Sequence, residues 1–231
     1  MKKILLPKPY LSYSARELWL RSKDQYRKRY YLGEEGPASP EMLFGKRIAK
    51  LLEEHPNDPL VAHIPRYTVA EYKIETEIDG VPTLAFLDSF EPDTLQFLDH
   101  KTSRKTSAGK DPWDRVRVAA HEQLPFYSML VKHEHRAVHP VAKIVWIETE
   151  FDKQTHKGIL ATNRKMKLTG RVEVFERRIA EWERKRQRTL HREVAEAISE
   201  DYQLWKKHHG EKGQGHASRI LLKNREARGA S

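Results

Sequence analysis

The sequence predicts an α/β fold in which a mixed β-sheet, an antiparallel three-strand meander plus further strands, is flanked by α-helices. Three segments between residues 72 and 101 have strand patterning, and the turn sequences Asp79-Gly80 and Glu91-Pro92-Asp93 separate them. Helical patterns precede this meander, and a helix and two further strand patterns follow it. Strands interrupted by a helix in this way are typical of a mixed sheet covered by helices.

Two helices are expected before the meander. Ser14-Ala15-Arg16-Glu17 has the pattern of a capping box, which predicts a first helix from about Ala15 to Tyr31, closed by Gly33. A second helix is expected over residues 41–54, ended by Pro56-Asn57-Asp58-Pro59. Its buried face is predicted to contain Leu43, Ile48, Leu51 and Leu52.

The meander itself is predicted from alternation. Every second residue from Tyr72 to Ile78 is apolar or uncharged and the others are charged, which predicts a half-exposed strand ending at the Asp79-Gly80 turn. The segments Thr83–Phe90 and Leu95–Lys101 predict the second and third strands.

The second half of the chain is expected to contain a helix, two strands and a long helix. Asp111 and Pro112 can begin a helix that runs to about His133. Strands are expected over residues 141–148 and 158–162, and Thr169 is expected to cap the long helix. Its buried face is predicted to contain Val172, Phe175, Ile179, Trp182, Leu190, Val194 and Ile198. Trp113 and Trp146 are expected in the core as well.

The composition limits the classes of function that are possible. The 231 residues include 43 Lys and Arg against 33 Asp and Glu, a formal charge of +10 that favours a polyanionic partner such as nucleic acid. The absence of cysteine excludes disulfides, thiolate zinc sites, cysteine nucleophiles and cysteine-bound iron–sulfur clusters. The apolar run after Met1 is too short for a signal peptide, and no segment has the length of a membrane span. We expect a cytoplasmic protein with one domain over residues 1–207 and a basic, flexible tail over 208–231.

Two strands of the meander contain charged residues in apolar surroundings. Asp88 lies in Phe86-Leu87-Asp88-Ser89-Phe90, and Asp99 and Lys101 lie in the next strand. Alternation places Asp99 and Lys101 on one face, and Asp88 joins them if the numbers of facing residues have an odd sum. A sum of 185, for example, would set Asp88 opposite Phe97 and requires an even number of loop residues. Spacing alone also allows a solvated strand end with an unrelated acid nearby.

The chemistry of phosphodiester hydrolysis needs these residue types. Carboxylate oxygens hold a hard cation such as Mg²⁺ or Mn²⁺, which neutralises the charge that builds up on the phosphate. A nearby ammonium group can orient the attacking water. Asp88, Asp99 and Lys101 are therefore the candidate active site of a nuclease.

The order of short motifs resembles the PD-(D/E)XK nuclease superfamily, in the branch of RecB-type nuclease domains and phage exonucleases. The likeness runs from about Ser12 to Glu183 and includes Asp88, Asp99-His100-Lys101-Thr102, and a helix with Gln123 and Tyr127. It implies a restriction-endonuclease-like fold. Asp88 and Asp99 would bind the metal, together with the backbone carbonyl of the residue after Asp99.

The same resemblance implies roles for the other motif residues. Lys101 would act on the attacking water, and Gln123 and Tyr127, one turn apart on a helix, would contact a phosphate or steady the lysine. Pro125 between them is expected to kink that helix. The implied substrate is DNA, cut from an end in recombination, repair or phage replication, with a recombination or replication protein as a partner.

One departure from the family pattern concerns the metal site. Ala49 stands where many relatives have a metal-binding histidine, four residues after the helix glycine Gly45. Glu53, one turn further along, is the first candidate for a third acidic ligand, and Glu75 is the alternative. The departure also leaves open a second function, a nucleic-acid-binding protein of the same fold without catalysis.

Overall fold

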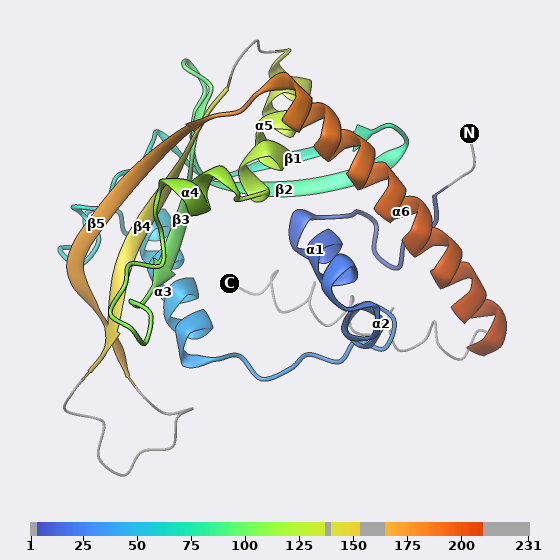
Figure 1. Cartoon of the computed structure of the whole chain (residues 1–231), viewed down its shortest axis with the longest axis horizontal. Coiled ribbons are helices and arrows are strands. Elements are labelled where there is room, and N and C mark those ends of the chain that lie inside the picture. The colour runs from blue at the N-terminus through green and yellow to red at the C-terminus, as the bar shows by residue number, and fades with distance from the viewer. Residues whose placement is uncertain (1–3, 137–139, 153–164, 210–231) are drawn as a thin grey trace. The chain divides into compact units, whose positions relative to one another are not determined.

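The computed structural model describes residues 4–136, 140–152 and 165–209 (Figure 1). Contacts divide the chain into two compact units. The first comprises Met1–Gly36, Glu75–Ala85 and Lys185–Ser231, and the second comprises Pro37–Ile74 and Phe86–Arg184. The expected strand over 158–162 and nearly all of the expected tail lie outside the described residues.

One five-stranded mixed sheet contains, in this spatial order, β1 (Val69–Ile78), β2 (Val81–Glu91), β3 (Gln96–Ser103), β4 (Val141–Phe151) and β5 (Met166–Arg178) (Figure 1). β3 pairs antiparallel with β2 and parallel with β4, and β4 pairs antiparallel with β5. The predicted α/β class with a mixed, helix-flanked sheet is confirmed.

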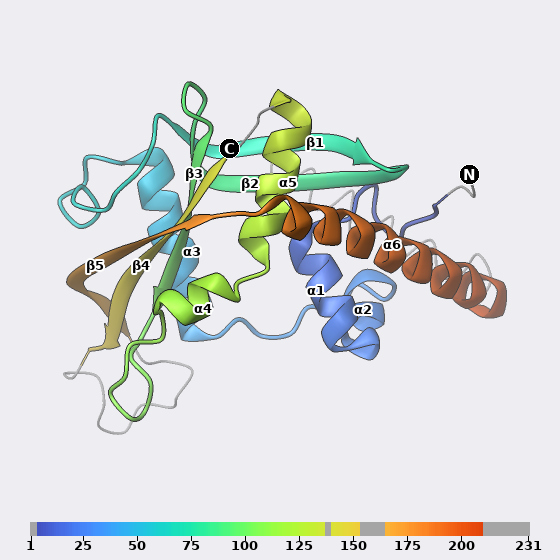
Figure 2. The same ribbon diagram turned by 45° about the horizontal axis from the view of Figure 1, so that its top comes forward.

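Helices of the second unit pack on both faces of this sheet. Leu98 of β3 packs with Ile48 and Leu52 of α3 (Pro40–Glu54). On the other face, the ring of Phe97 meets that of Tyr127 in α5 (Gln123–His135). Figure 2 shows α3 and α5 on opposite sides of β3. Alternate residues of β3 therefore face different helices, as strand geometry requires.

The segment that follows β3 contains a short helix, α4 (Arg115–Ala119), before α5, instead of the single expected helix. Asp114 caps α4, whereas Asp111 instead binds Arg171 of β5. Pro125 lies in the first turn of α5, where backbone N–H groups have no intrahelical acceptor, so it does not need to kink the helix.

The expected helix starting at Thr169 is wrong. Residues 166–178 form β5, which pairs with β4, and the long helix α6 (Glu181–His209) begins after it. Trp182 is 64% exposed at the start of α6, so its expected place in the core is also wrong, while Trp113 and Trp146 are buried as expected. In α3, Leu43 is 56% exposed, whereas Ile48 and Leu52 are buried.

The first unit has an aromatic core. Trp19 and Tyr26 pack edge to face, and they share a buried cluster with Tyr31 and with Val194 and Ile198 of α6. The single helix expected here is two, α1 (Tyr13–Arg21) and α2 (Lys23–Tyr30). They divide at Ser22, whose extended backbone and side chain cap α2. Ser12, not Ser14, caps α1.

The hairpin turn between β1 and β2 is formed as predicted. Asp79 and Gly80 both have positive φ, at 51° and 81°, the conformation of a tight two-residue hairpin turn. Within the described ranges, no helix is both long enough and apolar enough to cross a membrane.

Candidate active site

The pairing of β2 with β3 brings the two candidate aspartates to one face. Ser89 pairs with Leu98 and Phe90 with Phe97, so facing residues sum to 187. The sum is odd and residues 92–95 form a four-residue connection, which confirms the expected parity. The register with Asp88 opposite Phe97 is wrong, because Phe90 occupies that place. Asp88 therefore shares the face of Asp99 one position beyond the last ladder pair.

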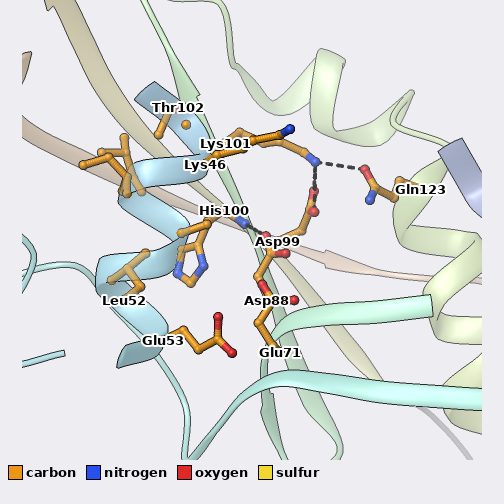
Figure 3. Close-up of a pocket in the computed structure, with 14 residues that line it drawn as sticks. Lys46, Leu52, Glu53, Glu71, Asp88, Asp99, His100, Lys101, Thr102 and Gln123 are labelled. Atoms are coloured by element: carbon orange, nitrogen blue, oxygen red, sulfur yellow. Dashed lines mark hydrogen bonds and ion pairs between the residues drawn. The ribbon is translucent and has the colours of Figure 1, made fainter. Parts of the chain in front are cut away.

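Lys101 connects the strand residues with α5. Its Nζ lies 2.9 Å from Oδ1 and 2.8 Å from Oδ2 of Asp99, and it donates to Gln123 Oε1 at 2.9 Å (Figure 3). The amide of Gln123 in turn donates to the hydroxyl of Tyr127 at 2.7 Å. The Asp-x-Lys motif and the Gln-x-x-x-Tyr motif thus meet in one hydrogen-bonded chain.

Asp88 is held by the backbone of β3. Its Oδ2 accepts a hydrogen bond of 2.6 Å from the N–H of His100 (Figure 3). The His100 ring points to the other side of the strand and contacts the carbonyl of Pro65 at 2.9 Å. Asp88 is thereby fixed beside the motif residues of β3.

These residues line a pocket of about 280 Å³ within the second unit. Glu53 of α3 lines it, whereas Glu75 is exposed and is not among its lining residues. Glu71 of β1 is a further lining acid that the sequence reasoning missed. Its φ of 48° departs from strand geometry, and nothing in the local sequence pattern indicates this.

More acidic than basic side chains line the pocket. Burial, together with the negative charge of Asp99, raises the pKa of Asp88 to about 7. Burial also opposes ionisation of Asp99, but Lys101 and His121 beside it hold its pKa below the ordinary value. Burial and the nearby charge of Glu53 raise the pKa of Glu71. A cation that entered the pocket would relieve this excess of acidic groups.

The donor set suits a hard divalent cation. In residues 4–136, 140–152 and 165–209, no three histidine or acidic side chains are grouped closely enough to hold an ion by themselves. Asp88 and Asp99 nevertheless supply carboxylate oxygens on one face, and Mg²⁺ is commonly bound by one or two carboxylates with water and substrate phosphate. The residues present fit such an ion, which Asp88 and Asp99 would hold.

Helix α3 lies close to the motif strand. A Cβ atom on Gly45 would lie 2.8 Å from Thr102 Oγ1, so any other residue here would require the Thr102 side chain or the helix to shift. Ala49 lines the pocket one turn further along α3.

Comparison with known proteins gives a family. The model of the PD-(D/E)XK nuclease superfamily matches residues 9–212. No curated protein matches the chain. Among solved structures, a proposed exonuclease from Eubacterium rectale is 12% identical, with a TM-score of 0.49 over 90% of this chain and 82% of that one. A phage-related exonuclease from Haemophilus somnus 129PT is 11% identical, with a TM-score of 0.46 over 78% of this chain and 81% of that one. On the extent of the family match, the chain belongs to the PD-(D/E)XK nuclease superfamily.

Proposed function

We propose that this chain is a Mg²⁺- or Mn²⁺-dependent nuclease that hydrolyses DNA phosphodiester bonds, with Asp88, Asp99 and Lys101 as its catalytic residues. The observation that supports this most directly is the pocket in which the two aspartates and the lysine meet. Asp88 and Asp99 would hold the cation. When bound, the cation would neutralise phosphate charge and favour deprotonation of water.

The remaining motif residues have supporting roles in this proposal. Gln123 accepts from Lys101 and so sets the direction of its ammonium group, and Tyr127 fixes the Gln123 amide. An ammonium group held in this way can orient water toward a phosphate in the pocket. Gln123 and Tyr127 would thus position Lys101, and Gln123 also lines the space that the phosphate would enter.

The broader setting follows from the family branch that the motifs resemble. We propose DNA as the substrate, cutting from an end, and a cytoplasmic role in recombination, repair or phage DNA metabolism, with a partner from those processes. The family match spans residues of both units. This supports residues 1–207 acting as one nuclease domain, with residues 208–231 as a basic tail.

A second candidate is a nucleic-acid-binding protein of this fold that does not cut. Ala49 in the pocket favours it, because a methyl group cannot replace the metal-binding histidine of many relatives. The retained aspartates and lysine favour catalysis. The two functions differ in whether a metal-dependent product is formed.

A cleavage assay separates them. Labelled duplex DNA, single-stranded DNA and RNA are incubated with the protein in Mg²⁺, Mn²⁺ or EDTA, and product length distinguishes cutting from an end from internal cutting. Asp99→Asn and Lys101→Met should each lower the rate by at least about 10²-fold. Lys50→Met is the matched control, since Lys50 is exposed on α3. Binding without any metal-dependent product would favour the second candidate, and undiminished cutting by both site variants would refute the site.

A further inference from the structure

A histidine outside the family motifs faces the buried aspartate. His121 Nε2 lies 3.5 Å from Asp99 Oδ2, a contact longer than an ordinary hydrogen bond. Asp99 is 1% exposed and the His121 side chain 21% exposed. His121 Nε2 is itself buried and makes no ordinary hydrogen bond to any described residue. Buried polar atoms usually make hydrogen bonds, so the approach of this ring nitrogen to a buried carboxylate calls for a functional explanation.

The position of His121 is fixed by several contacts within the second unit. The residue lies in the break between α4 and α5, two positions before Gln123. Arg177 of β5 donates to its carbonyl at 2.9 Å and to that of Val118 at 3.0 Å. The ring meets the buried ring of Trp113 edge to face, with centroids 5.1 Å apart. The backbone and the ring are thus both held, and the ring is directed at Asp99.

This contact matters because Lys101 contacts both oxygens of Asp99. A cation that binds Asp99 therefore competes with the lysine for the same carboxylate. His121 approaches from another part of the fold, so its contact does not depend on where Lys101 lies. Contacts of this kind orient metal ligands.

We infer that His121 is a positioning residue of the site, whose imidazole holds the Asp99 carboxylate in the orientation that binds the divalent cation. The inference rests on the proposed function only in taking Asp99 as a cation ligand. His121 acts through Asp99 and has no assigned contact with the substrate.

The test measures Mn²⁺ binding to the full chain by calorimetry and electron paramagnetic resonance, without nucleic acid. His121→Gln keeps an N–H donor, and His121→Met has a similar length without one. We expect His121→Met to weaken Mn²⁺ binding by about 10- to 100-fold and His121→Gln to restore most of it. His133→Met is the matched control, because His133 is exposed at the far end of α5. Circular dichroism checks folding, and His121→Phe, which keeps a ring beside Trp113, replaces His121→Met if that variant does not fold.

The outcomes separate the inference from the proposed function. Equal Mn²⁺ affinity in wild type and His121→Met overturns the inference, even if the protein cuts DNA. Equal losses in the Gln and Met variants overturn it too, since packing alone would then explain them. Mn²⁺ binding that depends on His121, in a protein that cuts no nucleic acid, supports the inference and removes the proposed function. No Mn²⁺ binding by wild type at millimolar concentrations overturns both.

Discussion

Neutralising Asp88 should stabilise the metal-free protein, and the gain should grow with pH. Asp88→Asn keeps the shape of the side chain and an oxygen that can accept from the His100 N–H. It removes a charge that burial and Asp99 make unfavourable, which is why the pKa of Asp88 is raised from 3.8 to about 7. A site that destabilises its own protein in this way is expected where a cation is needed to complete it.

The magnitude follows from proton linkage. Because the folded protein binds this proton more tightly than the unfolded chain, the stability contribution of Asp88 is complete below pH 3.8 and is lost as pH rises to about 7. The shift is about 3 pKa units, and each unit corresponds to about 1.4 kcal/mol, so the loss is at most about 4 kcal/mol. Asp88→Asn should therefore be about 2–4 kcal/mol more stable than wild type at pH 8, and about equal to it near pH 4.

Urea unfolding in EDTA at pH 4, 5, 6.5 and 8 measures this difference directly. Asp93→Asn, in the exposed turn between β2 and β3, controls for the loss of one negative charge. Adding Mg²⁺ at pH 8 should then stabilise wild type but not Asp88→Asn, since the variant lacks one of the two carboxylates proposed to hold the cation. This account of Asp88 would be refuted if the difference in unfolding free energy between Asp88→Asn and wild type did not change with pH. It would also be refuted if wild type were the more stable of the two at pH 8 without metal.

Three further variants test other contacts. Gly45→Ala should lower the free energy of unfolding by about 1–3 kcal/mol in thermal or urea denaturation, because its Cβ would meet Thr102 Oγ1 at 2.8 Å. The loss should be smaller in a Thr102→Ala background, and equal losses would contradict the contact. Tyr127→Phe removes the hydroxyl that accepts from Gln123 at 2.7 Å, so kcat should fall by about tenfold or less with little change in KM. In the first unit, Asp201 binds Arg27 and Tyr31, which lower its pKa, so its contribution is present at neutral pH and lost on acidification. Asp201→Asn should lower the free energy of unfolding by about 1–2 kcal/mol at pH 7, and this loss should disappear in acid. A loss of stability that did not depend on pH would contradict this role of Asp201.

The central strands could be predicted because their signals are local. Alternation fixes that Asp99 and Lys101 share a face of β3, and the even number of residues between the paired ends of β2 and β3 brings Asp88 to that face. The exact register could not be predicted, because sums of 185 and of 187 for the numbers of facing residues are both odd and both place Asp88 on the face of Asp99. Ring packing of Phe90 with Tyr72 and of Phe97 with Tyr127 accompanies the observed register, and those partners lie on other elements.

The residues that sequence reasoning missed depend on contacts distant in the chain. Glu71 reaches the pocket from a backbone conformation with positive φ, which an ordinary strand pattern does not indicate. His121 falls inside the helix expected to run from Pro112 to His133, where its direction could not be inferred. The break that directs it is held by Arg177, 56 positions away along the chain.

The unpredicted strand β5 also helps to explain why the direction of His121 could not be predicted. Val172, Phe175 and Ile179 match helical spacing, so the segment from Thr169 was expected to be a helix, and pairing with β4 overrides that preference. Strand β5 places Arg177 where it donates to the carbonyls of Val118 and His121, at the break between α4 and α5. A segment whose periodicity fits both a helix and a strand can thus affect the geometry of a candidate active site that contains none of its residues.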